Sequence, residues 1–174
     1  MKINFKNIIF FLVPGIVLIL FYISLNQNKY YDTEQIVGKK ISSFELKYLD
    51  SNNKLKDSDL TKNNFTLINI WSSWCLPCRQ EHHFLIRLKK NSSLKLLGLN
   101  FKDKKIHALK FLNSLGNPYH YVVKDNDGTA SIKLGAYGVP ESILINKDLY
   151  IIKKFVGPLN KNDYNEIIEI LDEK

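Results

Sequence analysis

Two cysteines, Cys75 and Cys78, are the only thiols in this chain of 174 residues. Such a Cys-x-x-Cys pair can be a structural disulfide, half of a metal site, or a reactive dithiol that cycles between reduced and oxidised forms. A disulfide that closes so short a loop removes little entropy from the unfolded chain, so it adds little stability. A structural metal site usually needs four ligands, and the sequence has no second cysteine pair.

Two histidines, His82 and His83, follow Cys78 by one helical turn, which leaves a Cys-Cys-His cluster and a copper-handling role open. One turn of one helix rarely converges on an ion without a ligand from elsewhere. Both histidines are therefore expected on the surface of their helix. His107 and His120 are isolated in the sequence, and no role is assigned to them.

The residues around the cysteines favour the reactive dithiol. An apolar run of strand length covers 65–71, and an amphipathic helix is predicted over about 76–88. The first thiol then lies at a helix N-terminus, where unpaired N–H groups and the helix dipole stabilise a thiolate. Cys75 is predicted to be the attacking nucleophile, and Cys78, one turn deeper, the thiol that resolves the mixed disulfide. Pro77 has no N–H to donate to the Cys75 sulfur, so the Cys75 thiolate is less stabilised. A less stable reduced form makes the protein a better reductant.

The other apolar patterns predict an α/β fold, a central mixed sheet with helices on both faces. The first two core strands should be parallel, because a helix connects them, and the last two should form an antiparallel hairpin. The predicted elements are an early strand over 41–50, a short pairing segment over 51–60, a strand over 94–101, a helix over about 108–115, a short strand over 119–123, two strands over 141–146 and 150–157, and a final helix over about 164–171.

The N-terminal segment predicts one transmembrane helix before this domain. No charge interrupts Ile8 to Leu25, which is roughly the shortest span of a bilayer. Lys2 and Lys6 precede it, which places the N-terminus in the cytoplasm and the rest of the chain across the membrane. No A-x-A-like cleavage pattern follows, so an uncleaved anchor is expected. The predicted organisation is an anchor with its cytoplasmic tip over 1–28, a linker over 29–35 and the domain over 36–174.

The net charge of +8 does not indicate a nucleic-acid partner. The basic residues are scattered in short pairs, without the long runs and interleaved aromatics of a nucleic-acid surface. They are interpreted as solvated surface residues. The pairs are Lys39-Lys40, Lys89-Lys90, Lys104-Lys105 and Lys153-Lys154.

The motif W-x-x-W-C-x-x-C, which follows an apolar strand, resembles the thioredoxin superfamily. The tripeptide "GVP" at 138–140 resembles the site where thioredoxin-like proteins carry a cis-proline that faces the dithiol. Residues 116–146 are similar to the membrane-anchored cytochrome c biogenesis proteins of the CcmG/DsbE type, and this resemblance covers roughly 36–160. It implies a thioredoxin-like fold. Pro140 would keep backbone groups open for an extended substrate segment.

The resemblance also implies the site and its chemistry. Cys75 and Cys78 take the redox positions, and Glu141 takes the place of the family's acidic active-site residue. The substrate groove would include Trp74, Pro77, Tyr137 and Pro140. Relatives of this type are thought to use no cofactor beyond the cysteine pair. They would reduce the haem-binding cysteines of apocytochrome c, or their thiol carrier, and take electrons from a membrane thiol-disulfide transporter. This implies a single-pass inner-membrane protein with its C-terminal domain in the periplasm.

One departure from thioredoxin concerns proton transfer. Thioredoxin has a buried aspartate where this chain has Asn69, and an amide cannot accept the proton of Cys78. Glu141 is the candidate substitute.

Three alternatives to this function stay open. A general membrane-tethered thioredoxin-like reductase with another envelope client is the first. A peroxiredoxin is the second, because "VGKKISSFELKYLD" resembles the opening that both groups share, but "NIWSSWC" lacks the proline expected before a peroxidatic cysteine. A copper chaperone is the third.

Overall fold

The computed structural model describes residues 5–25 and 34–173 of the chain, which divides into two units within 1–32 and 33–174. The first unit contains helix α1 (Phe5–Leu25). Within the described part of the chain, no helix combines the length and the apolarity of a membrane span. The N-terminal transmembrane helix therefore stays a prediction. The predicted linker over 29–35 lies almost entirely outside the described residues, as does Lys2.

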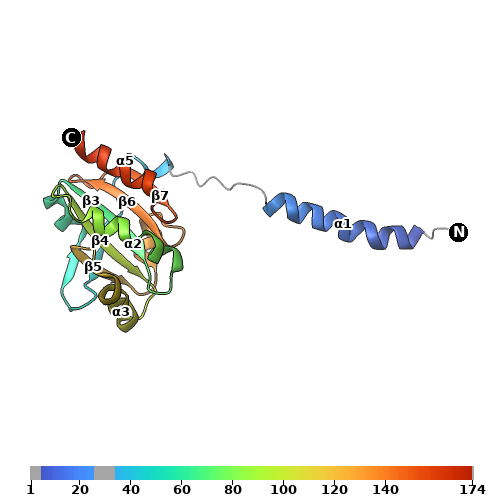
Figure 1. The fold of residues 1–174 in the computed structure, drawn as a ribbon, viewed down its shortest axis with the longest axis horizontal. Coiled ribbons are helices and arrows are strands. Elements are labelled where there is room, and N and C mark those ends of the chain that lie inside the picture. Colours follow the sequence, from blue (N-terminus) through green and yellow to red (C-terminus); the bar gives the residue numbers. More distant parts are fainter. Residues whose placement is uncertain (1–4, 26–33, 174) are drawn as a thin grey trace. The chain divides into compact units, whose positions relative to one another are not determined.

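The second unit is built on a five-stranded mixed sheet with the strand order β5-β4-β3-β6-β7 (Figure 1). The strands β3, β4 and β5 are parallel, whereas β6 is antiparallel to β3 and to β7. The predicted parallel pair and the closing antiparallel hairpin are both confirmed. The strands of this sheet are β3 (Phe65–Trp71), β4 (Leu94–Phe101), β5 (Tyr121–Asp125), β6 (Glu141–Asn146) and β7 (Ile151–Val156).

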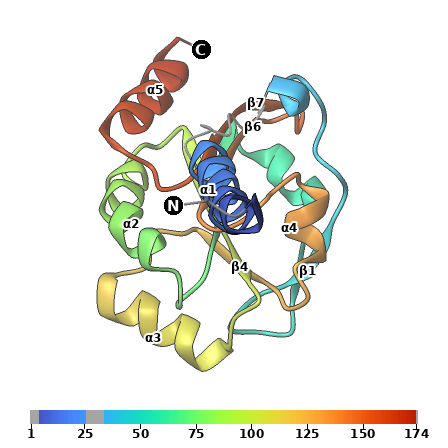
Figure 2. The ribbon, with the colours of Figure 1, turned by 90° about the vertical axis from the view of Figure 1, so that its right-hand side faces the viewer.

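Helices cover both faces of this sheet, as Figure 2 shows. One face packs against α2 (Leu76–Leu88), α3 (Lys105–Leu115) and α5 (Lys161–Asp172), and the opposite face against α4 (Thr129–Lys133) and the 3₁₀-helix η2 (Asp57–Lys62). All seven residues of β3 are buried. A strand covered on both faces needs apolar residues at nearly every position, which explains why this segment is a continuous apolar run.

Two parts of the second unit differ from the predictions. The early strand predicted over 41–50 shrinks to β1 (Glu45–Lys47), which pairs with β2 (Lys54–Lys56) in a separate two-stranded sheet. The helix α4 was not predicted, because five residues are too short for a helical period to show in the sequence. A further one-turn 3₁₀-helix, η1, covers Glu34–Ile36.

An aromatic stack fills the core beneath the cysteines. The buried ring of Trp71 lies 5.1 Å from that of Phe111 and is stacked on that of Tyr119 at 5.6 Å, measured between ring centroids. Gly98 leaves room for this stack, because a Cβ atom there would lie 2.7 Å from two ring atoms of Tyr119. The stack packs β3, which leads into the segment that carries the cysteines, against α3.

Candidate active site

Cys75 and Cys78 form a disulfide where β3 ends and α2 begins. Cys75 is the N-cap of α2, and its sulfur accepts a hydrogen bond of 3.1 Å from the backbone N–H of Cys78. Pro77 lies in the first turn, where its missing N–H breaks no intrahelical bond. Both sulfur-bearing side chains are buried in this oxidised form, whereas Leu76 and Pro77 between them are exposed. The predicted placement of the first thiol at a helix N-terminus is confirmed.

The loop before Cys75 is fixed by polar contacts to the end of β4. The Asp103 carboxylate accepts hydrogen bonds from the backbone N–H of Ser73 at 2.6 Å and from its hydroxyl at 2.8 Å. The indole N–H of Trp74 donates to the carbonyl of Lys102 at 3.3 Å, while the Trp74 side chain stays 60% exposed. The loop therefore holds a large aromatic surface in the open, directly beside Cys75.

Glu141 follows Pro140, whose peptide bond with Val139 is cis. The Glu141 carboxylate is buried, and one of its oxygens accepts hydrogen bonds from the backbone N–H groups of Tyr137 and Gly138, at 2.7 and 2.8 Å. Glu141 thus organises the loop that enters β6 at Pro140. Its predicted function as a proton acceptor stays a prediction.

Lys154 neutralises this buried carboxylate. Its side-chain nitrogen lies 2.8 Å from the second oxygen of Glu141 and donates to the carbonyl of Gly135 at 2.6 Å. The same nitrogen lies 4.1 Å from the centroid of the exposed Tyr137 ring. Lys154 is only 3% exposed, so its interpretation as a solvated surface lysine was wrong. A buried charge is stable only when it is paired, and here the pair connects β7 to the 135–141 loop.

A second buried carboxylate, Glu81, lies on the face of α2 that carries Cys78. Its two oxygens accept hydrogen bonds from the side-chain amide of Asn69 at 2.8 Å and from the backbone N–H of Leu159 at 2.7 Å. Asn69 also donates to the Ser142 hydroxyl at 3.0 Å and accepts a hydrogen bond of 2.7 Å from the Tyr119 hydroxyl. Asn69 thus occupies the centre of a polar network inside the apolar core.

Glu81 was missed in the sequence, although a signal was present. It lies three residues after Cys78, on the stripe that continues with Leu85 and Leu88, where a carboxylate is out of place. Burial raises the pKa of Glu81 to about 7, and the hydrogen bonds from Leu159 and Asn69 oppose part of that rise. A carboxyl group that titrates near neutral pH can both accept and release a proton.

The histidines next to Glu81 behave differently from each other. His82 is buried, and its Nε2 lies 2.8 Å from the carbonyl oxygen of Gly116, so the prediction that it lies on the surface was wrong. The pKa of His82 is lowered by burial. His83 is exposed, as predicted. In the part of the chain that the structure describes, no group of three or more histidine, cysteine, aspartate or glutamate side chains could hold a metal ion.

The raised pKa of Glu81 predicts a pH dependence of stability. The folded protein holds the Glu81 proton up to about pH 7, whereas the unfolded chain releases it near 4.5. The free energy of unfolding should therefore fall as pH rises between these values, by at most about 3 kcal/mol, with the full loss present above pH 7. Glu81→Gln cannot ionise and should lack this decline. Urea unfolding of both proteins at pH 5 and pH 8 measures it.

The difference between variant and wild type isolates Glu81, because His82 and His120, whose pKa values burial lowers, are present in both proteins. Glu169→Gln changes an exposed glutamate and serves as the matched control. An equal pH dependence in wild type and Glu81→Gln would contradict the raised pKa.

Comparisons with known proteins agree on one group. Residues 36–168 match the Redoxin family. The chain is 38% identical over 139 residues to the thiol:disulfide interchange protein DsbE of Vibrio cholerae, which covers 80% of this chain and 75% of that protein. It is 36% identical over 140 residues to DsbE of Escherichia coli, with the same coverage. It is 47% identical over 97 residues to CycY of Rhizobium leguminosarum, across 56% of this chain and 52% of that protein.

Solved structures show the same fold. A crystal structure described as DsbE from Chlorobium tepidum has a TM-score of 0.67 at 26% identity, covering 79% of this chain and 95% of its own. A DsbF homologue from Corynebacterium diphtheriae has a TM-score of 0.67 at 23% identity, covering 83% of this chain and 90% of its own, and this likeness shows the fold alone. The fold is thus thioredoxin-like. With its Cys75–Cys78 pair, the chain belongs to the Redoxin family as a thiol:disulfide oxidoreductase related to the DsbE and CycY interchange proteins.

Proposed function

We propose that this protein is a reductant of protein disulfides in the periplasm. Its client is apocytochrome c, whose haem-binding cysteine pair it reduces, or the thiol carrier protein that exchanges disulfides with that pair. The observation that carries the proposal is the Cys75–Cys78 disulfide at the N-terminus of α2, beside the exposed Trp74 and in a chain related to DsbE. Pro77, which offers no N–H to the Cys75 sulfur, favours the reducing direction.

The reaction is a two-step exchange of thiols and disulfides. In the reduced protein, the Cys75 thiolate attacks one sulfur of the client disulfide, forms a mixed disulfide and releases the other client sulfur as a thiolate. Cys78 then loses its proton and attacks the Cys75 sulfur, which releases the second client thiol. Two electrons pass to the client, and the protein is left with the Cys75–Cys78 disulfide that the structure contains. A membrane thiol-disulfide transporter would reduce this disulfide for the next cycle.

The proton of Cys78 needs an acceptor in the second step. Glu81 supports this role by its place one turn beyond Cys78 on α2 and by its pKa of about 7. Glu141, the acceptor that the resemblance implies, is held by two backbone N–H groups and by Lys154. We assign the proton transfer to Glu81 and the shape of the Pro140 loop to Glu141.

The N-terminal segment is proposed to anchor the protein in the inner membrane with its C-terminal domain in the periplasm. The support is the uncharged run from Ile8 to Leu25, which is preceded by Lys2 and Lys6. A tether would keep the dithiol close to a reductant in the same membrane.

Complementation of a deletion strain tests function and location together. Loss of the protein should abolish haem-stained c-type cytochromes, and the full chain should restore them. A chain without residues 1–28 should remain in the cytoplasm and restore no c-type cytochromes. Its yield as soluble protein is measured to check that it folds. An external small thiol should partly restore assembly, because it replaces the missing electrons. Normal cytochromes in the deletion strain would contradict the proposed client, and restoration by the truncated chain would contradict the location.

A further inference from the structure

A hollow of about 320 Å³ opens beside the dithiol, between the loop that carries Trp74 and helix α3. Trp74 and Phe111 supply its aromatic walls, and Trp74 is the neighbour of Cys75. The hollow is separate from the Pro140 loop, which contributes none of its lining residues. Those residues are Ser73, Trp74, Arg79, His107, Lys110, Phe111 and Ser114.

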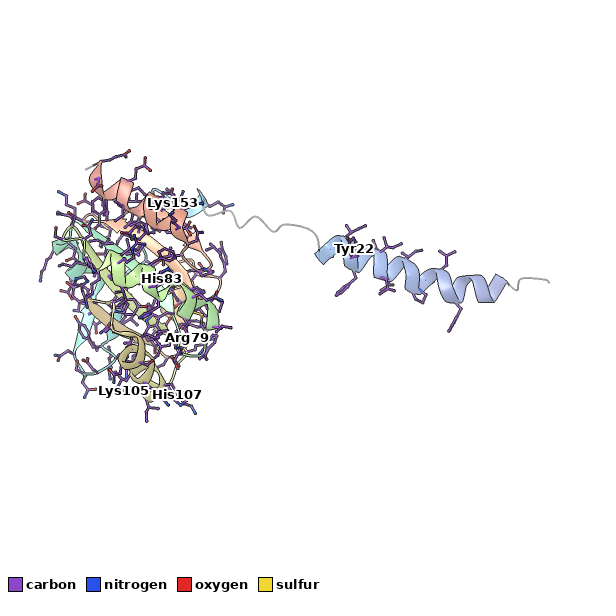
Figure 3. The ribbon with its side chains drawn as sticks, in the orientation of Figure 1. Tyr22, Arg79, His83, Lys105, His107 and Lys153 are labelled. Carbon is purple, nitrogen blue, oxygen red and sulfur yellow. A yellow bond between two sulfur atoms is a disulfide. The ribbon has the colours of Figure 1, made fainter. Side chains whose placement is uncertain are left out.

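The charged groups of this hollow are cationic. Arg79 and Lys110 line it, and the Arg79 guanidinium carbon lies 4.9 Å from the centroid of the Phe111 ring, which fixes the side chain against one wall. The ion pairs found among the described residues use neither cation. Figure 3 shows Arg79, Lys105 and His107 at the end of the domain where α3 lies, away from Lys153.

Among the ion pairs of the described residues, Asp103 forms none with Arg79 or Lys110. Its carboxylate accepts hydrogen bonds from the backbone and hydroxyl of Ser73, from the side-chain amide of Asn100 at 3.1 Å and from the backbone N–H of Lys104 at 2.8 Å. Lys102 and Lys104 flank it in the sequence and are exposed. The charges of Arg79, Lys110, Lys102 and Lys104 outnumber the single charge of Asp103, so the rim next to the nucleophile keeps a net positive charge.

We propose that this hollow binds the carboxylate of an aspartate or glutamate that flanks the client's disulfide. This inference rests on the proposed function, because it assumes that a polypeptide disulfide reacts at Cys75. The guanidinium fork of Arg79 matches a carboxylate in two parallel hydrogen bonds, and Lys110 adds a second charge. The volume accommodates an acidic side chain, whose methylene groups would contact Trp74 and Phe111.

A cationic site next to Trp74 and Cys75 gives selectivity among disulfides, because it favours those flanked by acidic residues. Opposite charges bring the client to Cys75 faster and hold it there while the sulfurs exchange. Salt weakens such an effect, since the Debye length shrinks to about 3 Å at 1 M ionic strength. The preference for acidic clients should therefore be strongest at low ionic strength.

Two matched peptides test the site with the reduced full-length chain in non-ionic detergent. Both carry the same oxidised Cys-x-x-Cys, one flanked by glutamates and the other by glutamines. The acidic peptide should be reduced about 10-fold faster at low salt, and this advantage should shrink at high salt. The double variant Arg79→Gln/Lys110→Gln should reduce both peptides at similar rates. The ratio of the two rates cancels any change in the reactivity of Cys75 itself, because one enzyme serves both peptides.

The control variant Lys90→Gln/Lys147→Gln removes the same charge from exposed residues outside the hollow and should keep the wild-type ratio. Equal rates for both peptides with the wild-type chain would overturn the site and leave the proposed function standing. A control variant that loses the preference as fully as the Arg79 and Lys110 variant would also overturn it, since net charge alone would then explain the effect. Failure to reduce either peptide would contradict the proposed function and this inference with it.

Discussion

Replacing Cys75 with serine is expected to reduce the rate of client reduction to the uncatalysed background. A serine hydroxyl is not ionised at neutral pH and cannot form a disulfide, so the first exchange has no nucleophile. The structure places this sulfur at the N-cap of α2 beside the exposed Trp74, where the helix N-terminus stabilises a thiolate, and Cys78 lies in the first turn of the same helix. The rate is measured as thiols released from an oxidised Cys-x-x-Cys-His peptide by the reduced full-length chain.

Two controls separate loss of chemistry from loss of fold. The thermal unfolding of Cys75→Ser should match that of the reduced wild type, because the oxygen replaces a sulfur at a helix N-cap, a position that serine favours. Cys78→Ser should still complete the first exchange once per molecule. A Cys75→Ser variant that keeps most of the wild-type rate would show that Cys78 can start the reaction alone.

The architecture could be predicted because the spacing of apolar residues indicates most of its helices and strands. The run over 65–71 is apolar at nearly every position, and the structure shows β3 in the middle of the sheet with helices on both faces. The cysteine motif after this run identifies where the chemistry takes place. The parallel pairing of β3 and β4 followed from the helix between them, whereas the strand order of the whole sheet was not predicted.

The residues that could not be predicted are those whose polarity conflicts with their burial. Glu81, His82 and Lys154 are all buried, and each finds its partners in distant parts of the chain: Leu159, Gly116 and Glu141 respectively. A prediction from sequence places polar residues on the surface, because burying a polar group without a hydrogen-bond partner is costly. The partners become known only when the sheet brings them together.

Electrostatics divides the site into two regions with different tasks. The carboxylates of Glu81 and Glu141 are buried and fully engaged in hydrogen bonds or an ion pair. The cations Arg79 and Lys110 line an open hollow beside Trp74. In the account proposed above, Glu81 accepts the proton of the resolving thiol and Glu141 shapes the Pro140 loop, whereas Arg79 and Lys110 select the client.

Capture of the client by Cys78→Ser is the second large effect expected. The variant lacks the thiol that resolves the mixed disulfide, so the covalent complex between Cys75 and the client should accumulate. In the wild type that complex should be short-lived, because Cys78 lies within one helical turn of Cys75 and the two sulfurs already form a disulfide in the structure. The Cys75→Ser/Cys78→Ser double variant has no nucleophile and should capture nothing.

The identity of the captured protein tests the account most directly. The full-length Cys78→Ser chain is expressed in cells that make c-type cytochromes, free thiols are blocked on lysis, and disulfide-linked partners are released with reductant and identified by mass spectrometry. The account predicts apocytochrome c or its thiol carrier, joined to Cys75 through a cysteine of the haem-binding pair. A broad mixture of envelope proteins without enrichment of these partners would contradict it and would indicate a general reductase.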